Sequence, residues 1–259
     1  MPTYLNQDFC FCTLAFQAKY RNLAKELAET LEKYSSGTTL VIGTDQPEAF
    51  QNSPNVFAFK LHQTGILYCY HDKRFVIQEA LKHFPTAIQI DADTKIVGDV
   101  SQEIPQTEGL AAGHIEDIVE HVQKYNPERL IYLRKIAAKL DLSLDNVSYV
   151  GESLFAVTAH SKKSEAFIKY WDAIARYLEI HGIHSGEGNA IGMAAAKAGL
   201  KVYNPLWLGK INSVRKHLDA SDRKSERTQW EVLQRKLAYH YRLNKARIIS
   251  LKDFDFFYS

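Results

Sequence analysis

Two carboxylates stand one residue apart in this sequence, at Asp91 and Asp93. They follow an apolar segment, residues 86–90, in which Ile88 and Ile90 suit the pleated surface of a buried strand. Side chains two residues apart in extended backbone point to the same side, so both carboxylates are expected to aim at one point beyond the strand. Such a pair suits a hard divalent cation that bridges to substrate phosphates. A strand-end turn without a ligand is the alternative.

Strands and helices alternate through the first hundred residues, which predicts a mostly parallel sheet with helices on both faces. The helices are indicated by apolar residues that recur every three or four positions, and the strands by continuous β-branched and aromatic runs. We expect strands at 9–16, 38–43, 56–61 and 86–90, and helices at 18–34 and 73–84.

The second half of the chain continues with a less regular pattern. A polar loop follows residue 100, and the segment 164–181 carries a strong apolar stripe that is typical of a core helix. We expect strands at 110–113, around 151–157 and at 201–203, and helices at 127–140, 164–181 and 187–198.

The composition is that of an ordinary globular protein and excludes several classes. Of the 259 residues, 46% are hydrophobic, and a formal net charge of +2 gives no footprint of a nucleic-acid-binding protein. No apolar run approaches the ~20 residues of a membrane-spanning helix, and no signal-type segment begins the chain. The three cysteines are too few and too irregular for a disulfide framework, so we expect buried thiols in a soluble intracellular protein.

Polar clusters fall where an open α/β sheet binds its ligands, beyond the carboxyl ends of the strands. Thr44 and Asp45 follow the second strand, and Lys73 and Arg74 begin the helix before the 86–90 strand. A helix N-terminus with adjacent cations favours a phosphate group. The glycine patterns of dinucleotide-binding folds, P-loop enzymes and α/β-hydrolases are absent from the sequence.

This layout resembles the GT-A fold of nucleotide-sugar-dependent glycosyltransferases, in which an Asp-x-Asp at the end of a middle strand holds Mn²⁺ against a nucleotide diphosphate. Residues 149–156 (YVGESLFA) are similar to the acceptor-side strand of the retaining histo-blood-group type transferases. Residues 184–187 (HSGE) are similar to their later His-Asp-Glu-Ser segment. The resemblance implies a single Rossmann-like domain over residues 1–259, with a nucleotide-binding half (1–100), an acceptor half (101–205) and a basic, helical C-terminal extension (206–259).

The resemblance also implies roles for individual residues. Asp91 and Asp93 would contact Mn²⁺ or Mg²⁺ and the diphosphate. Glu187 would match the carboxylate beneath the anomeric carbon, and Glu152 is a rival catalytic or acceptor-binding carboxylate. The remaining candidates would hold the base, ribose and diphosphate of the donor: Phe16, Thr44, Asp45, Lys73, Arg74 and Lys210. Lys210 belongs to a basic stretch, residues 210–227, that is either a solvated face or a lid over the diphosphate.

Other interpretations of these carboxylates and histidines stay open. Glu187 could cap a helix, Glu152 could be a paired inward polar residue, and His114 could be a substrate contact or a structural hydrogen-bonder. If the enzyme inverts configuration, Glu187 or Glu152 would serve as general base instead.

The resemblance favours a metal-dependent transferase that moves a sugar, from a UDP-sugar by preference, to a saccharide or other hydroxyl acceptor with retention. A nucleotidyltransferase is one rival, although the loop after the first strand has no glycine. A noncatalytic interaction protein that uses the basic C-terminal region is another. We expect a cytoplasmic protein that binds no nucleic acid; peripheral attachment to a membrane and a homodimer through the C-terminal aromatic segment stay open.

Overall fold

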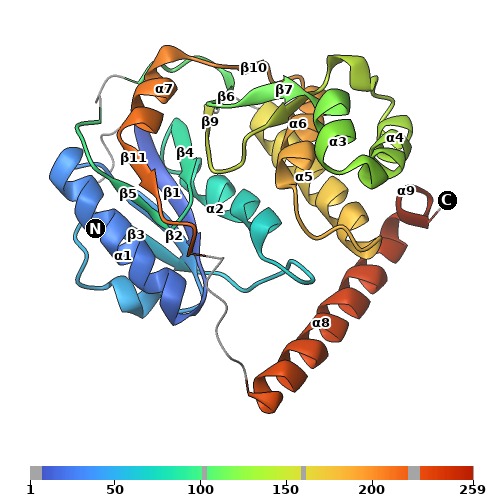
Figure 1. The fold of residues 1–259 in the computed structure, drawn as a ribbon, viewed down its shortest axis with the longest axis horizontal. Coiled ribbons are helices and arrows are strands. Elements are labelled where there is room, and N and C mark those ends of the chain that lie inside the picture. Colours follow the sequence, from blue (N-terminus) through green and yellow to red (C-terminus); the bar gives the residue numbers. More distant parts are fainter. Residues whose placement is uncertain (1–7, 101–103, 159–161, 221–227, 259) are drawn as a thin grey trace.

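A seven-stranded sheet lies at the centre of the computed structural model, which describes residues 8–100, 104–158, 162–220 and 228–258 (Figure 1). The strands follow the order β10-β6-β9-β4-β1-β2-β3 across the sheet. Their bounds are β1 (Phe9–Ala15), β2 (Leu40–Thr44), β3 (Val56–Lys60), β4 (Thr86–Ile90), β6 (Gly109–Ala112), β9 (Leu154–Thr158) and β10 (Val202–Tyr203).

The direction of β9 decides which loops meet at the end of β4. All neighbouring strands of the sheet pair in parallel except β9, which runs antiparallel to both β4 and β6. In the β4–β9 register, Ile90 lies opposite Leu154. The turn that precedes β9 therefore lies beside the residues that follow β4, which places Glu152 next to Asp91.

Helices cover both faces of the sheet, as the alternating sequence predicts, so the expected α/β class with a mostly parallel sheet is confirmed (Figure 1). On one face, α1 (Gln17–Tyr34) packs through Leu27 and Leu31 against Phe11 and Ile88. The other face is covered by α2 (Lys73–Ala80), α5 (Lys162–Ile180) and α6 (Glu187–Ala198), with the fully buried Trp171 among their core residues.

Two short antiparallel ribbons lie outside the main sheet. One pairs β5 (Thr94–Ile96) with β11 (Arg215–His217), and the other pairs β7 (Ile115–Asp117) with β8 (Ser148–Val150). The chain passes from β7 directly into α3 (Ile118–Tyr125), and α4 (Leu130–Lys139) follows α3 after a 3₁₀ turn. Short 3₁₀ turns lie at Pro47–Phe50, Tyr70–Asp72, Pro127–Arg129, Leu144–Asn146 and Leu251–Asp253.

The C-terminal extension is helical, as expected, but it is built in two different ways. Helix α7 (Leu206–Ser213) buries Leu208 and Ile211 and leads into β11, so residues 206–217 are part of the folded body. Helix α8 (Gln229–Ser250) runs along the outside of the molecule and leads to α9 (Phe254–Tyr258) (Figure 1). Among the described residues, no helix is both long and apolar enough to cross a membrane.

Several predicted boundaries differ from the observed ones for local reasons. Helix α2 ends at Ala80 rather than residue 84, because the following residues form tighter turns, with the Lys82 amide bonded to the Glu79 carbonyl. The predicted helix at 127–140 begins with a 3₁₀ turn at Pro127. Asp72 precedes α2, but its carboxylate accepts hydrogen bonds from the backbone of Thr64 and Gly65 instead of capping the helix.

Replacement of Gly192 by alanine should destabilise the protein. Helix α6 approaches β8 so closely that a Cβ at Gly192 would lie 1.7 Å from the backbone oxygen of Ser148, which only a backbone movement could relieve. Overpacking of this kind costs about 1–3 kcal/mol, so the midpoint of urea unfolding should fall.

The matched control is Gly209→Ala in α7, where a new Cβ meets nothing within 4 Å. Alanine is favoured over glycine in a helix by roughly 0.5–1 kcal/mol, so this variant should be unchanged or more stable. Equal midpoints for the two variants would contradict the close approach of α6 to β8.

Candidate active site and metal centre

The Asp91–Asp93 turn lies at the carboxyl end of β4, as the sequence predicts. The side chain of Asp91 is 23% exposed, whereas Asp93 is buried. Asp93 is held by the segment that follows β11: its carbonyl accepts from the Leu218 amide at 2.8 Å, and its Oδ2 accepts from the Ala220 amide at 2.9 Å. A backbone segment from the C-terminal extension thus fixes the second carboxylate.

The same segment brings a histidine to the pair. His217 ends β11, and its Nδ1 lies 3.6 Å from Oδ1 of Asp93. Ligand atoms of Asp91, Asp93 and His217 all lie within 4.8 Å of one another. Carboxylate oxygens suit Mg²⁺ and Mn²⁺, and imidazole suits transition metals, so this donor set fits a divalent ion such as Mn²⁺.

Lys73 connects the Asp91 turn to the second half of the chain. Its ammonium lies 2.8 Å from Oδ1 of Asp91 and 3.0 Å from Oε1 of Glu187, and it donates to the carbonyl of Glu152 at 3.2 Å. Burial alone would lower the pKa of this lysine, but the charges of Asp91 and Glu187 outweigh it and raise the pKa well above its ordinary value. An ammonium has three N–H donors, and all three have acceptors here.

Glu187 begins α6 and is almost fully buried. The residue before it, Gly186, has a φ of +79°, a left-handed conformation that glycine adopts without strain. The guanidinium of Arg129 donates to the carbonyl and the hydroxyl of Ser185, both at 3.1 Å, and so anchors this turn. Glu187 is the first residue of α6, but among the described residues its side chain makes no capping hydrogen bond; it pairs with Lys73 and so lies close to the Asp91 cluster. Its catalytic role stays a prediction.

Glu152 lies in the turn between β8 and β9. Its Oε2 accepts a hydrogen bond from the Tyr149 hydroxyl at 2.7 Å. Burial and the nearby charge of Glu187 raise its pKa from 4.5 to about 7, against the opposing effect of the Tyr149 hydrogen bond. A carboxyl group with a pKa near 7 can hold or release a proton at neutral pH, as an acid or base catalyst must.

Three residues predicted to hold the base and ribose lie together at the ends of β1 and β2. Phe16 directly follows β1, and Thr44, the last residue of β2, donates its hydroxyl to the Ala15 carbonyl at 2.7 Å. The Asp45 carboxylate lies 2.6 Å from the guanidinium of Arg21. Partial burial would raise the pKa of Asp45, but the hydrogen bond and charge of Arg21 outweigh this effect and lower the pKa, so the carboxylate stays ionised. The nucleotide-binding role of these residues stays a prediction.

Two predicted donor-binding residues lie apart from this cluster. The guanidinium of Arg74 is bound by Asp172 of α5, at 3.1 Å from Nε and 2.7 Å from Nη2, and by the carbonyl of His71. It therefore points to the helix layer instead of to Asp91. Lys210 lies exposed on α7. Residues 221–227 of the predicted basic lid lie outside the described residues, and residues 215–217 form β11.

Arg215 belongs to the basic stretch that the sequence left as a solvated face or a lid, and the structure ties it to the turn before β9. The Arg215 guanidinium binds the carbonyl and hydroxyl of Ser153, at 3.2 and 3.0 Å, which ties β11 to the turn that carries Glu152. Burial, followed by the negative charges of Asp93 and Asp91, raises the pKa of Tyr20. Burial and the charge of Glu187 raise the pKa of Tyr70 to about 12. The Arg215–Ser153 contact joins distant parts of the chain, so no sequence spacing could have indicated it.

Comparison with known proteins identifies the fold. No protein-family model and no curated protein sequence matches the chain. Among solved structures, it is similar to the galactosyltransferase LgtC, whose crystal structure was determined in complex with donor and acceptor sugar analogues. The two share 10% sequence identity and a TM-score of 0.54, over 90% of this chain and 95% of LgtC. The chain therefore shares the fold of this galactosyltransferase, which is the GT-A-like fold that the resemblance in the sequence implied.

The raised pKa of Glu152 predicts how stability depends on pH. Between its unfolded value near 4.5 and its folded value of about 7, the folded chain binds more protons at this residue than the unfolded chain does. The contribution of Glu152 to the free energy of unfolding therefore falls as the pH rises through this window, and it is complete only below pH 4.5. The Glu152→Gln variant lacks this titrating group. The free energy of unfolding of the variant, relative to that of the unsubstituted protein, should therefore rise between pH 5 and pH 8.

Urea unfolding at several pH values would measure this difference. The control is Glu29→Gln, which removes an exposed carboxylate of α1 far from the candidate site. A Glu152→Gln variant that behaves like this control would contradict the raised pKa.

Proposed function

We propose that this protein is a metal-dependent glycosyltransferase that moves a sugar from a nucleotide-diphosphate donor, a UDP-sugar by preference, to a hydroxyl acceptor. The observation that carries the proposal is the convergence of Asp91, Asp93 and His217 at the end of β4, within a GT-A-like fold. The Lys73 bridge from Asp91 to Glu187 adds a buried carboxylate to the same centre.

The two aspartates and His217 would hold Mn²⁺ or Mg²⁺. When bound, the ion would supply Lewis-acid stabilisation of the leaving diphosphate. Other residues of the chain hold these two carboxylates in place, since the backbone amide of Ala220 donates to Asp93 and the Lys73 ammonium pairs with Asp91. Phe16, Thr44 and Asp45, at the ends of β1 and β2, would receive the base and ribose.

Glu187 and Glu152 are suited to different parts of the transfer. Glycosyl transfer passes through a state with positive charge on the anomeric carbon, which a buried carboxylate such as Glu187 would stabilise or attack. Glu152, with a pKa of about 7, is placed to exchange a proton with an acceptor hydroxyl. We favour retention of configuration, with Glu187 beneath the sugar, and inversion with Glu152 or Glu187 as general base as the alternative.

The finer resemblance to the histo-blood-group type transferases also belongs to this proposal. It is supported by the segments 149–156 and 184–187, which carry Glu152 and Glu187. These two segments lie close together: Gly188, the residue after Glu187, is so near Glu152 that a Cβ added to it would lie 2.7 Å from Oε2 of Glu152. The acceptor half of the proposed site is thus compact, with both carboxylates in it.

Metal-dependent binding of UDP is the first testable consequence. Calorimetric titration of UDP should give binding in the presence of Mn²⁺ and none after the metal is removed with a chelator. Asp91→Asn keeps the size of the side chain but removes a ligand charge, and it should weaken Mn²⁺-dependent binding by about tenfold or more. Asp99→Asn, at an exposed aspartate soon after β5, is the matched control and should bind UDP normally.

A failure of every nucleoside diphosphate to bind, with or without metal, would contradict the proposed donor site. Binding that is unaffected by chelator and by Asp91→Asn would contradict the metal centre. In the first case a noncatalytic role of the C-terminal region becomes the better hypothesis. A nucleotidyltransferase would instead be indicated by metal-dependent binding of nucleoside triphosphates and release of diphosphate from them.

Glu187→Gln should separate binding from chemistry. The amide oxygen can still accept from Lys73, so UDP and Mn²⁺ should bind nearly as before, but the negative charge near the reacting carbon is lost. We expect the hydrolysis of bound UDP-sugars, with water as acceptor, to fall by about 100-fold or more. Release of UDP from a panel of UDP-sugars measures this rate. An unchanged rate would contradict a catalytic role and leave Glu187 as a structural partner of Lys73.

A further inference from the structure

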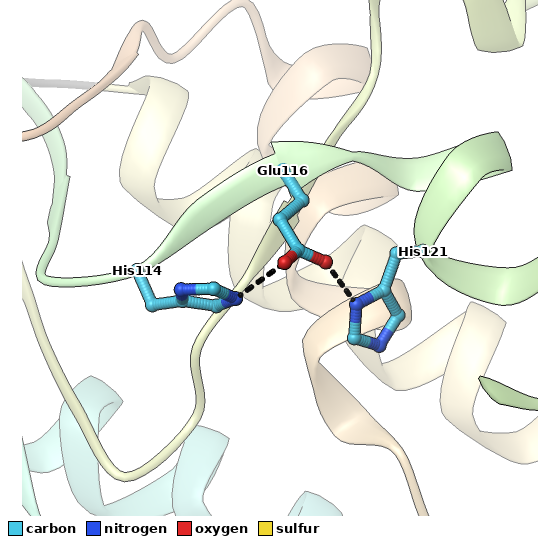
Figure 2. Close-up of side chains that lie close together, drawn as sticks. All are labelled: His114, Glu116 and His121. Carbon is cyan, nitrogen blue, oxygen red and sulfur yellow. Dashed lines mark hydrogen bonds and ion pairs between the residues drawn. The ribbon is translucent and has the colours of Figure 1, made fainter. Parts of the chain in front are cut away.

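A second cluster of metal-ligating side chains lies on the β7–β8 ribbon, and the proposed transferase site does not use it. The carboxylate of Glu116 lies between the imidazole rings of His114 and His121 (Figure 2). Oε1 of Glu116 is 3.2 Å from Nε2 of His114, and Oε2 is 2.6 Å from Nδ1 of His121. Ligand atoms of all three residues lie within 4.8 Å of one another.

Local backbone structure brings the three residues together. Glu116 is in β7, and Asp117, the next residue, caps α3 by accepting from the amides of Val119 and Glu120. This cap fixes the direction in which α3 leaves the strand, and so places His121 on the side of Glu116. His114 precedes β7 and is held by a hydrogen bond from the Gly151 amide to its carbonyl at 2.9 Å.

Gly151 also makes room for His114. A Cβ at position 151 would lie 2.9 Å from the Cβ of His114, closer than side chains tolerate. The glycine thus permits the close approach of the two segments that form one side of the cluster.

The rings are held in place by aromatic contacts before any ion binds. The His121 ring stacks on Tyr149 with centroids 3.5 Å apart and planes 9° apart, and it contacts Tyr125 at 4.8 Å. The His114 ring meets Tyr149 edge-on at 6.0 Å. A site whose ligands are already oriented loses less conformational entropy on binding, so this packing favours a defined ligand geometry.

The donor set matches a known class of ion. Two imidazole nitrogens and one carboxylate oxygen are the three protein ligands of many zinc sites that keep an open position for water. The Nε2–Oε1 distance of 3.2 Å is close to the separation of two ligands that each lie about 2.0 Å from a tetrahedral ion, and the Oε2–Nδ1 contact of 2.6 Å is a hydrogen bond that the ion would replace. The ring of His114 is 58% exposed and that of His121 only 15%, so the open side of the cluster faces solvent.

We propose that His114, Glu116 and His121 bind a divalent transition-metal ion, zinc by preference, with water in the remaining coordination positions. This site differs from the Asp91 cluster, which has two carboxylates and one histidine and suits harder ions. The proposal does not depend on the transferase function. An ion here would hold the ring against which Tyr149 stacks, and the Tyr149 hydroxyl binds Glu152.

The experiment uses the full, tag-free chain that carries Asp91→Asn and Asp93→Asn, so that the other metal cluster is disabled. Equilibrium dialysis against Zn²⁺, followed by metal analysis of the protein, should give one bound ion per chain. Adding His114→Ala should weaken the binding by at least about tenfold, since loss of even an outer-shell partner costs roughly 10- to 100-fold. His114 is largely exposed, so its loss should leave the fold intact.

Two further variants make the result specific. Glu116→Gln keeps the side-chain size but removes the ligand charge, and it should weaken zinc binding in the same direction as His114→Ala. His62→Ala removes an exposed histidine outside the cluster and should leave binding unchanged. Absence of bound zinc in the parent chain, or binding that survives His114→Ala and Glu116→Gln, would overturn the proposal.

Discussion

The arrangement of the candidate active site depends on one buried cation, the Lys73 ammonium. It contacts the carboxylate of Asp91 after β4 and the carboxylate of Glu187 at the start of α6. It also donates a hydrogen bond to the carbonyl of Glu152 in the turn before β9. A buried charge is costly unless it is paired and hydrogen-bonded, so these three segments must stay near one another for Lys73 to remain buried. At this point electrostatic attraction, as well as packing, joins the first hundred residues of the chain to the segments that carry Glu152 and Glu187.

The local parts of this arrangement could be predicted from the sequence. The strand at 86–90 and the helix at 187–198 were predicted with the observed boundaries, because each has a clear apolar pattern and a clear stop at its end. The Asp91–Asp93 turn follows from the strand. The α/β class follows from the alternation of such elements, which is a local property repeated along the chain.

The partners of those residues could not be predicted, because they are set by pairing between distant segments. Nothing near position 217 indicates that β11 will pair with β5 and bring His217 to Asp93. The reversal of β9, which places Glu152 beside Asp91, is likewise a property of sheet topology. Lys73 and Arg74 are adjacent in sequence, yet one faces Asp91 and the other faces Asp172, since neighbouring residues on a helix point in different directions. Helix α8 carries Trp230, Leu233, Leu237 and Tyr241 at a spacing of three or four residues, yet all four side chains are exposed, so an apolar pattern alone did not indicate what the helix packs against.

The β5–β11 ribbon has a consequence for the way in which this protein would respond to an ion. His217 comes from a three-residue strand that pairs with another three-residue strand. Arg215, Leu218 and Ala220 add hydrogen bonds to the turn before β9 and to Asp93, so the segment is attached by local contacts outside the central sheet. An ion that binds His217 together with the β4 turn would favour this attachment, and the attachment would strengthen the binding of the ion by the same factor. Order in the C-terminal segment would then report the concentration of the metal.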